Sequence, residues 1–212
     1  MTQADPFDLT RIVEVPSAAD SLIVIDDGGW DNACVNWTDT VGSWTLYATG
    51  YKDAADILVA HVLTQYRQHD TLVYPIAFLY RQYLELSIKY VIRQARWLLD
   101  ISDPLPKTHD ISELWRICHN LLLRIEGIVP DEELKQIARL IGEFSAIDRG
   151  SIAFRYPEDK DGNPSLSMHR INLRILKEGI EKMSVILDGT GSMVHEYLQY
   201  KLEETRSYRS DY

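Results

Sequence analysis

The spacing of apolar residues constrains the fold of this chain more than any other feature. From Tyr51 onward, apolar side chains recur every three or four residues, which places them on one face of an α-helix. In residues 75–99 they occupy nearly every side of the predicted helix, so neighbouring elements must bury it. We therefore predict a mainly α protein, an up-and-down bundle of about five to six helices with 75–99 at its centre.

Start and stop signals divide this region into helices. Asp110, followed by Glu113 three residues later, predicts a helix that begins with Asp110 as its N-cap. Pro75 suits the first turn of a helix, where its missing amide hydrogen would have no partner. The tract 188–191 (DGTG) is expected to kink or end the helix that begins near His169. The expected helices are 51–68 (ended by 69–71), 75–99, one from Asp110, one from Asp131, 169–188 and a final one through 193–202.

Two segments interrupt the helical pattern. Residues 1–48 are expected to form an acidic, β-rich or irregular arm, and short strands are predicted at 21–25, 33–37 and 43–47. A second interruption near 153–166 contains two prolines and an Asp161-Gly162 step, which predicts a loop or a short hairpin. The predicted domains are the arm at 1–48, the helical bundle at 49–206 and a frayed tail at 207–212.

The charge distribution bears on the class of partner. The net charge of -10 disfavours a polyanion, because nucleic-acid affinity depends largely on Lys and Arg neutralising phosphates. Acidic residues dominate 1–50, however, whereas 81–124 has a small basic excess, and this excess is equally consistent with a local phosphate-binding face and with a solvated helix surface. No apolar stretch is long enough to span a membrane and no signal-peptide pattern opens the chain, so we expect a cytoplasmic protein without a membrane partner.

The candidate chemistry centres on Arg81, Glu85 and Lys89, which share one stripe of the predicted helix at i, i+4 and i+8. Arg81 borders the apolar surface and needs a partner, because an unpaired buried cation is costly. One interpretation is a structural Arg81–Glu85 ion pair. The other is a phosphate site in which Arg81 and Lys89 are joined by His109 and Arg155, since Arg binds phosphate bidentately and His titrates near neutral pH.

Other types of site lack a sequence signal. The histidines and the two cysteines do not have the spacing of metal ligands, so no metal site is predicted. A glycine-rich phosphate loop and a nucleophile elbow are also missing from the sequence. We accordingly predict no cofactor.

Three segments, in this order, resemble the HEPN superfamily of small helical proteins: 78–89 (FLYRQYLELSIK), 109–115 (HDISELW) and 154–157 (FRYP). The resemblance implies a helical bundle that often dimerises. It also implies either an RNase of a defence, toxin–antitoxin or RNA-processing system, or a module that binds RNA or a nucleotide. The candidate ligand-binding residues are Arg81, Glu85, Lys89, His109, Asp110, Arg155 and Tyr156.

The sequence departs from the catalytic pattern of this family. Active members carry an Arg and a His separated by four to six residues on one helix, and no pair in this chain has that spacing. The nearest pair, Arg116 and His119, has two residues between its members and lies on different lines of the helix. The leading hypothesis is therefore a non-catalytic module that binds RNA or a nucleotide, and that forms a homodimer.

Two alternatives remain open at the level of the sequence. The first is a metal-independent RNase with a non-standard catalytic set drawn from Arg81, His109 and Arg155. The second is a protein-interaction or dimerisation domain that uses the apolar stripe of residues 173–187 and the acidic arm to bind a protein partner. An exposed stripe would favour the second alternative.

Overall fold

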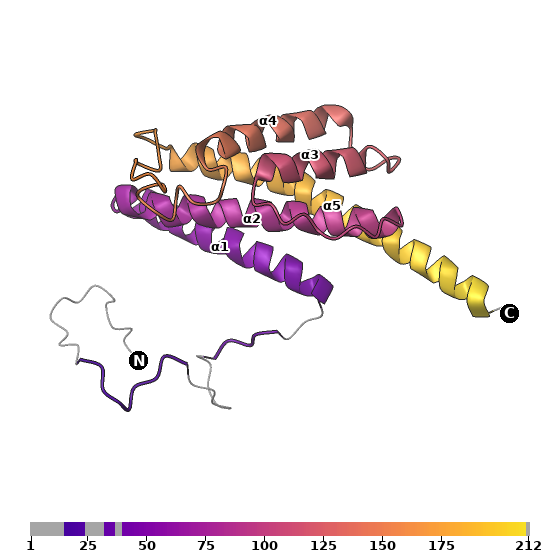
Figure 1. Ribbon diagram of the computed structural model, residues 1–212, viewed down its shortest axis with the longest axis horizontal. Coiled ribbons are helices and arrows are strands. Elements are labelled where there is room, and N and C mark those ends of the chain that lie inside the picture. The colour runs from indigo at the N-terminus through magenta and orange to yellow at the C-terminus, as the bar shows by residue number, and fades with distance from the viewer. Residues whose placement is uncertain (1–14, 24–31, 37–39, 211–212) are drawn as a thin grey trace. The chain divides into compact units, whose positions relative to one another are not determined.

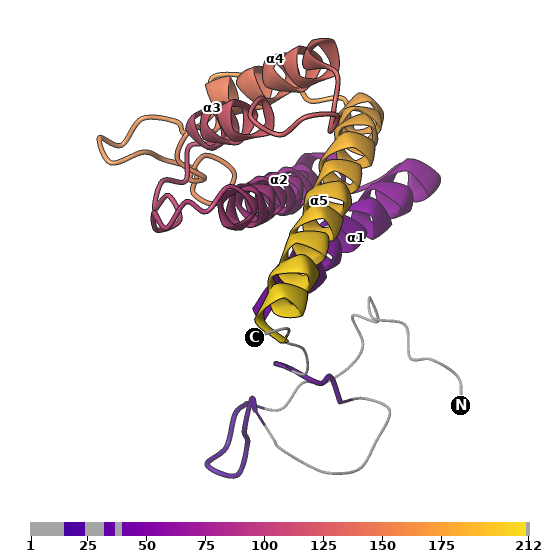
Figure 2. The same cartoon turned by 90° about the vertical axis from the view of Figure 1, so that its right-hand side faces the viewer.

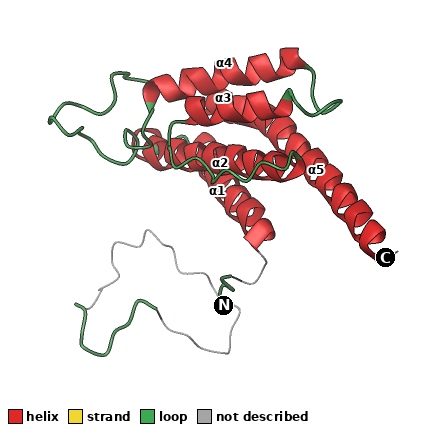
Figure 3. Cartoon of the chain, turned by 45° about the vertical axis from the view of Figure 1, so that its right-hand side comes forward, coloured by secondary structure: helices red, strands yellow, loops and turns green. Residues whose placement is uncertain are grey.

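The computed structural model describes residues 15–23, 32–36 and 40–210. The regular secondary structure of these ranges consists of α-helices alone, which confirms the predicted mainly α bundle (Figures 1 and 3). The chain divides into two units, Met1–Trp37 and Thr38–Tyr212, and all helices of the described residues lie in the second. The helices are α1 (Thr40–Gln65), α2 (His69–Leu98), α3 (Ile111–Leu122), α4 (Asp131–Ile147) and α5 (Leu173–Ser210).

Helix α2 is the centre of the bundle, as its apolar composition predicts. It packs against α1, α3 and α5, while α4 packs on α3. Figures 1 and 2 show α3 and α4 together on one side of α2, with α1 and α5 along its remaining surface. Its side chains are buried over several faces, including Ile76, Leu84, Ile88 and Val91. The polar residues Arg81, Glu85 and Gln94 project from these faces and are therefore buried in the interior.

Helix α1 begins at Thr40, which corrects two predictions. Residues 43–47 are helical rather than a strand, and the helix begins eleven residues before Tyr51. Ala48, Ala55, Val59 and Val62 are buried at helical spacing, so packing of this face in the core outweighs the local β preference. The predicted strands at 21–25 and 33–37 are not formed at residues 21–23 and 33–36, and their other positions lie outside the described residues.

The turn between α1 and α2 lies earlier than predicted. Tyr66 and Gln68 adopt left-handed conformations with φ of 53° and 64°, and this reverses the chain before His69. The tract 69–71, predicted to be a helix break, is instead the first turn of α2. Pro75 consequently lies inside α2 rather than in its first turn, and it omits one amide donor near the helix N-terminus.

Helix α5 is continuous, which corrects the predicted break at 188–191. A Cβ atom at Gly191 would lie 3.1 Å from Cε1 of Tyr90, so this glycine permits the close approach of α2 and α5 and does not end the helix. The helix continues through the predicted tail as far as Ser210. The apolar stripe of 173–187 faces the core, and its buried members are Leu173, Ile180, Met183 and Leu187.

The structure agrees with three further local predictions, whereas the helix predicted to begin near His169 begins at Leu173. The carboxylate of Asp110 caps α3 by accepting the amides of Ser112 and Glu113 at 3.0 and 3.3 Å. Helix α4 begins at Asp131 as expected. An isolated antiparallel bridge between Glu158 and Pro164 gives the loop at 153–166 the character of a short hairpin. None of the helices within the described ranges is long and apolar enough to cross a membrane.

The two glycines of the 188–191 tract provide a test of the continuous helix. Gly189 has open space where a Cβ would lie, so Gly189→Ala is expected to raise the free energy of unfolding by about 0.5–1 kcal/mol. Gly191→Ala, the matched control, should gain less or lose stability because its methyl group meets Tyr90. Urea denaturation measures both values. Destabilisation by Gly189→Ala would contradict a helical conformation at this position.

Candidate functional site

Arg81 lies at the centre of a buried polar network. Its side chain is 0% exposed. Nη1 donates to Oε2 of Glu85 at 3.2 Å, Nη2 donates to the backbone carbonyl of His109, and Nε donates to the backbone carbonyl of Asp148 at 3.4 Å. The Arg81 guanidinium thus joins α2 to His109, which precedes α3, and to Asp148, which follows α4. The Arg81–Glu85 ion pair of the structural interpretation is present.

Glu85 is the anion of this network and is 4% exposed. Its Oε1 accepts a bond from Nζ of Lys89 at 2.8 Å and lies 2.8 Å from Nδ1 of His109. Burial pushes the pKa of Glu85 upward, but the bonds from Lys89 and His109 and the charge of Arg81 outweigh burial and hold the pKa below its usual value. The carboxylate is therefore ionised and compensated by its neighbours.

A second cluster surrounds the N-cap of α3. Oδ1 of Asp110 accepts a hydrogen bond from the hydroxyl of Ser145 at 3.1 Å, and Oδ2 accepts one from Nε of Arg149 at 2.7 Å. Burial raises the pKa of Asp110, yet Arg149, the amides of Ser112 and Glu113 and the Ser145 hydroxyl together lower it. Asp110 therefore has a structural role, because its carboxylate joins the start of α3 to the end of α4.

Asp148 and Ser151 order the segment that follows α4. Oδ1 of Asp148 accepts the amides of Ile152 and Ala153 at 2.7 and 3.0 Å. Ser151 has a left-handed φ of 58° and its hydroxyl accepts a bond from Gln82 of α2 at 2.9 Å. Sequence reasoning missed these contributions. The polar residues from Asp148 to Ser151 were the available sequence signal for an ordered segment. Gln82, the α2 residue that binds Ser151, is distant in sequence and could not be identified from it.

Arg155 lies on the surface beyond this segment. Its Nε donates to the carbonyl of Ser151 at 2.5 Å, and its guanidinium carbon is 5.8 Å from the ring centroid of Phe78 and 5.6 Å from that of Tyr156. No carboxylate of the described residues forms an ion pair with it. The charge of Arg155 is therefore not neutralised by a carboxylate within those ranges.

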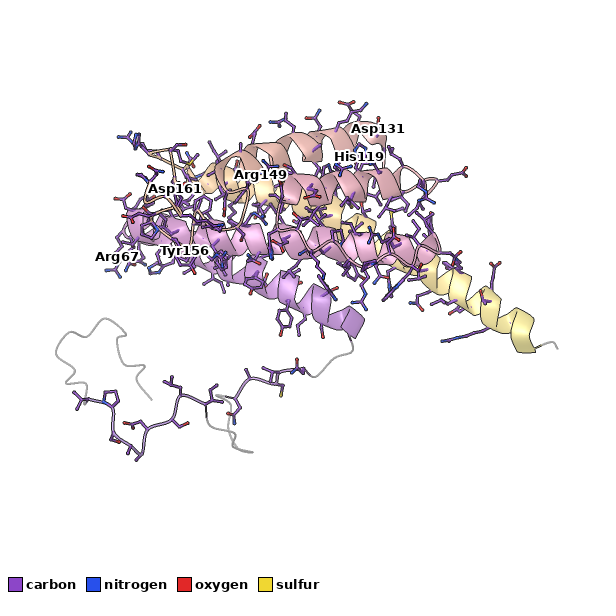
Figure 4. The ribbon with its side chains drawn as sticks, viewed as in Figure 1. Arg67, His119, Asp131, Arg149, Tyr156 and Asp161 are labelled. Carbon is purple, nitrogen blue, oxygen red and sulfur yellow. The ribbon has the colours of Figure 1, made fainter. Side chains whose placement is uncertain are left out.

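The predicted site residues thus fall into three groups, one of which is Asp110 alone in the cluster at the N-cap of α3. Arg81, Glu85, Lys89 and His109 meet in the buried network, although Arg81 contacts the His109 backbone and not its imidazole. Arg155 and Tyr156 form a separate, exposed group beside a hollow of about 460 Å³. Figure 4 shows Tyr156 at the end of the helical unit where α1 connects to α2. The hydrogen-bonded pair His119 and Asp131 lies toward the other end of this unit.

The helical unit is thus an all-α bundle that contains a buried charged network around Arg81 and carries an exposed surface formed by Arg155 and Tyr156. No protein-family model, curated protein or solved structure matches the chain. The resemblance of its three segments to the HEPN superfamily therefore stays a prediction.

Removal of the Arg81 side chain tests the role of the buried network. Arg81→Met is expected to lower the free energy of unfolding by about 3–5 kcal/mol, because Glu85 loses its buried partner and two carbonyls lose a donor. Arg149→Ala is the control, since Arg149 is exposed and its ion pair with Asp110 should contribute little to stability. Urea denaturation measures both variants. Similar losses would contradict a central role for Arg81.

The lowered pKa values of Glu85 and Asp110 predict a pH dependence of stability. A carboxyl group with a depressed native pKa stabilises the fold above its unfolded pKa, and this contribution is lost as the pH falls through the native value. The free energy of unfolding should therefore fall below about pH 4–5. In Glu85→Gln the dependence should be shallower, and urea titrations across this range measure it. An unchanged slope would show that Glu85 does not contribute.

Proposed function

We propose that this chain is a HEPN-like module that binds RNA or a nucleotide through the surface around Arg155 and lacks the Arg–His nuclease centre of that superfamily. The observation that carries the proposal is the environment of Arg155. Arg155 is an exposed residue, its guanidinium lies near the rings of Phe78 and Tyr156, and it has no acidic partner among the described residues. Arginine beside aromatic rings suits a phosphate that is attached to a stacked base.

The buried network supports this proposal indirectly. Arg81 binds the carbonyl of Asp148, and Asp148 in turn orders the backbone of Ile152 and Ala153 next to Arg155. Arg81 itself is a poor phosphate ligand, because it is fully buried and each of its nitrogens donates to a protein acceptor. The proposed ligand-binding cation is therefore Arg155, and Arg81 and Glu85 act as supporting residues.

The overall charge shapes the expected affinity. A protein with a net charge of -10 repels an extended polyanion, so binding should depend on a few contacts and should weaken as salt rises. A homodimer and a role in defence or toxin–antitoxin systems form part of the proposal through the resemblance, and a cytoplasmic setting forms part of it through the sequence expectation. A partner that docks on the 173–187 stripe is not proposed, because that stripe faces the core.

An RNase is the second candidate, and the geometry of His109 favours it over other reactions. Glu85 holds Nδ1 of His109 while the side chain remains 65% exposed, so the second ring nitrogen can meet a ligand. A carboxylate-oriented imidazole is suited to general acid–base catalysis. His109 would then be the general acid or base, and Arg81 would position it through its backbone carbonyl, while Arg155 lies in the separate exposed group.

Binding of labelled single-stranded RNA at low salt tests the proposed function. Arg155→Ala should weaken binding about ten-fold or more, because a charge-assisted hydrogen bond is worth about 1.5–3 kcal/mol. Arg116→Ala removes an exposed arginine of α3 and should bind as the wild type does. Equal binding by both variants and the wild type would place the site elsewhere, and no binding at all would overturn the proposal.

The same RNA distinguishes the two candidates. Incubation with the protein in EDTA should leave the RNA intact if the module is non-catalytic. Metal-independent cleavage that is lost in a folded His109→Gln variant would instead establish the RNase. Cleavage that His109→Gln retains would exclude His109 from the reaction.

A further inference from the structure

The hollow beside Arg155 has walls from two parts of the chain. Tyr74, near the N-terminus of α2, forms one wall. The two arms of the hairpin form the rest, with Tyr156 and Pro157 on the outgoing arm and Ser165 and Leu166 on the returning arm. Phe154 and Met168 also line the space. The volume of about 460 Å³ lies within the range of small-molecule sites, which is about 300–1,000 Å³.

Hydrogen bonds fix the shape of the hairpin. The amide of Ser165 donates to the carbonyl of Pro157 at 2.9 Å, which joins the two arms next to the hollow. At the tip, Oδ1 of Asp159 accepts the amides of Asp161 and Asn163, each at 2.9 Å. Gly162 has a φ of 80°, a conformation that glycine adopts without strain. The walls are thus held by hydrogen bonds within the hairpin, which lowers the entropy cost of binding.

The lining matches a flat molecule with apolar faces and polar edges. Tyr74 and Tyr156 are 48% and 56% exposed, so aromatic surface is available at the hollow. The hydroxyl oxygen of Ser165 is buried there and has no hydrogen-bond partner among the described residues. A nucleobase has this combination, because its faces stack on aromatic rings while its edge bonds to a hydroxyl.

The charges around the hollow limit the size of the ligand. Arg155 supplies one cation at its edge, whereas the hairpin tip is net negative because Glu158, Asp159 and Asp161 outnumber Lys160. Such a surface favours one or a few phosphates over a long polyanion. A duplex is excluded from the hollow for a second reason, since its bases are stacked and paired and cannot enter a pocket.

We propose that this hollow binds one unpaired nucleobase, with the attached phosphate on Arg155, so that the ligand is a single-stranded nucleotide unit. This inference rests on the proposed function and specifies its ligand class. The unit is either a free ribonucleoside monophosphate or an unpaired residue of an RNA chain, which share the same base, ribose and phosphate.

Calorimetric titration with nucleoside monophosphates and ribose 5-phosphate tests the base requirement. Because a stacked base adds to the affinity, at least one monophosphate should bind about five-fold or more tightly than ribose 5-phosphate. Tyr156→Ala and Tyr74→Ala should weaken the nucleotide and leave ribose 5-phosphate unchanged, whereas Arg155→Ala should weaken both. Tyr200→Ala, at an exposed tyrosine of α5, is the control. Circular dichroism verifies that each variant is folded.

A parallel series with single-stranded and duplex RNA of the same sequence distinguishes the two sources. If mononucleotides do not bind but single-stranded RNA binds better than duplex and is weakened by Tyr156→Ala, the unit belongs to an RNA chain and the inference holds. If ribose 5-phosphate equals the nucleotides, or RNA binding depends on Arg155 but not on either tyrosine, the base pocket is overturned while the proposed phosphate binding stands. No binding of any probe overturns both.

Discussion

The buried guanidinium of Arg81 is the interaction on which this structure depends. Helix α2 packs against three other helices, so a cation at its centre has no access to water and must be compensated by protein groups. Burial lowers the pKa of Arg81, and the neighbouring charges of Glu85, Asp148 and Asp110 oppose that shift. The segments that supply acceptors, at Glu85, His109 and Asp148, are far apart in sequence and are fixed together by this one requirement.

The same requirement separates supporting residues from those available to a ligand. The cations nearest the interior, Arg81 and Lys89, are paired with Glu85, whereas Arg155 contacts a backbone carbonyl and aromatic rings. The charges of Arg81 and Lys89 are therefore neutralised by Glu85 inside the bundle and are not available to a phosphate. The charge of Arg155, at the exposed edge of the bundle, is not neutralised by a carboxylate of the described residues. The proposed ligand contacts lie at that edge for this reason.

Local sequence was sufficient where one short-range interaction determines the structure. The N-cap at Asp110 and the acidic start of α4 were predicted because the side chains that form them are adjacent in sequence. The strand at 43–47 and the break at 188–191 were wrong because tertiary packing overrode local preference. In the second case Gly191 fits beneath Tyr90 of α2, a contact that sequence spacing does not reveal.

The sequence by itself determined the helical class, the central position of α2, and the fact that Arg81 needs a partner, since all three follow from the periodicity of apolar residues along a helix. Only the tertiary structure decided which groups meet that need. It brought the His109 and Asp148 carbonyls to Arg81, and it left Arg155 and Tyr156 beside a hollow. The physical reason is that burial and pairing depend on contacts between distant segments, which are set by packing and not by spacing along the chain.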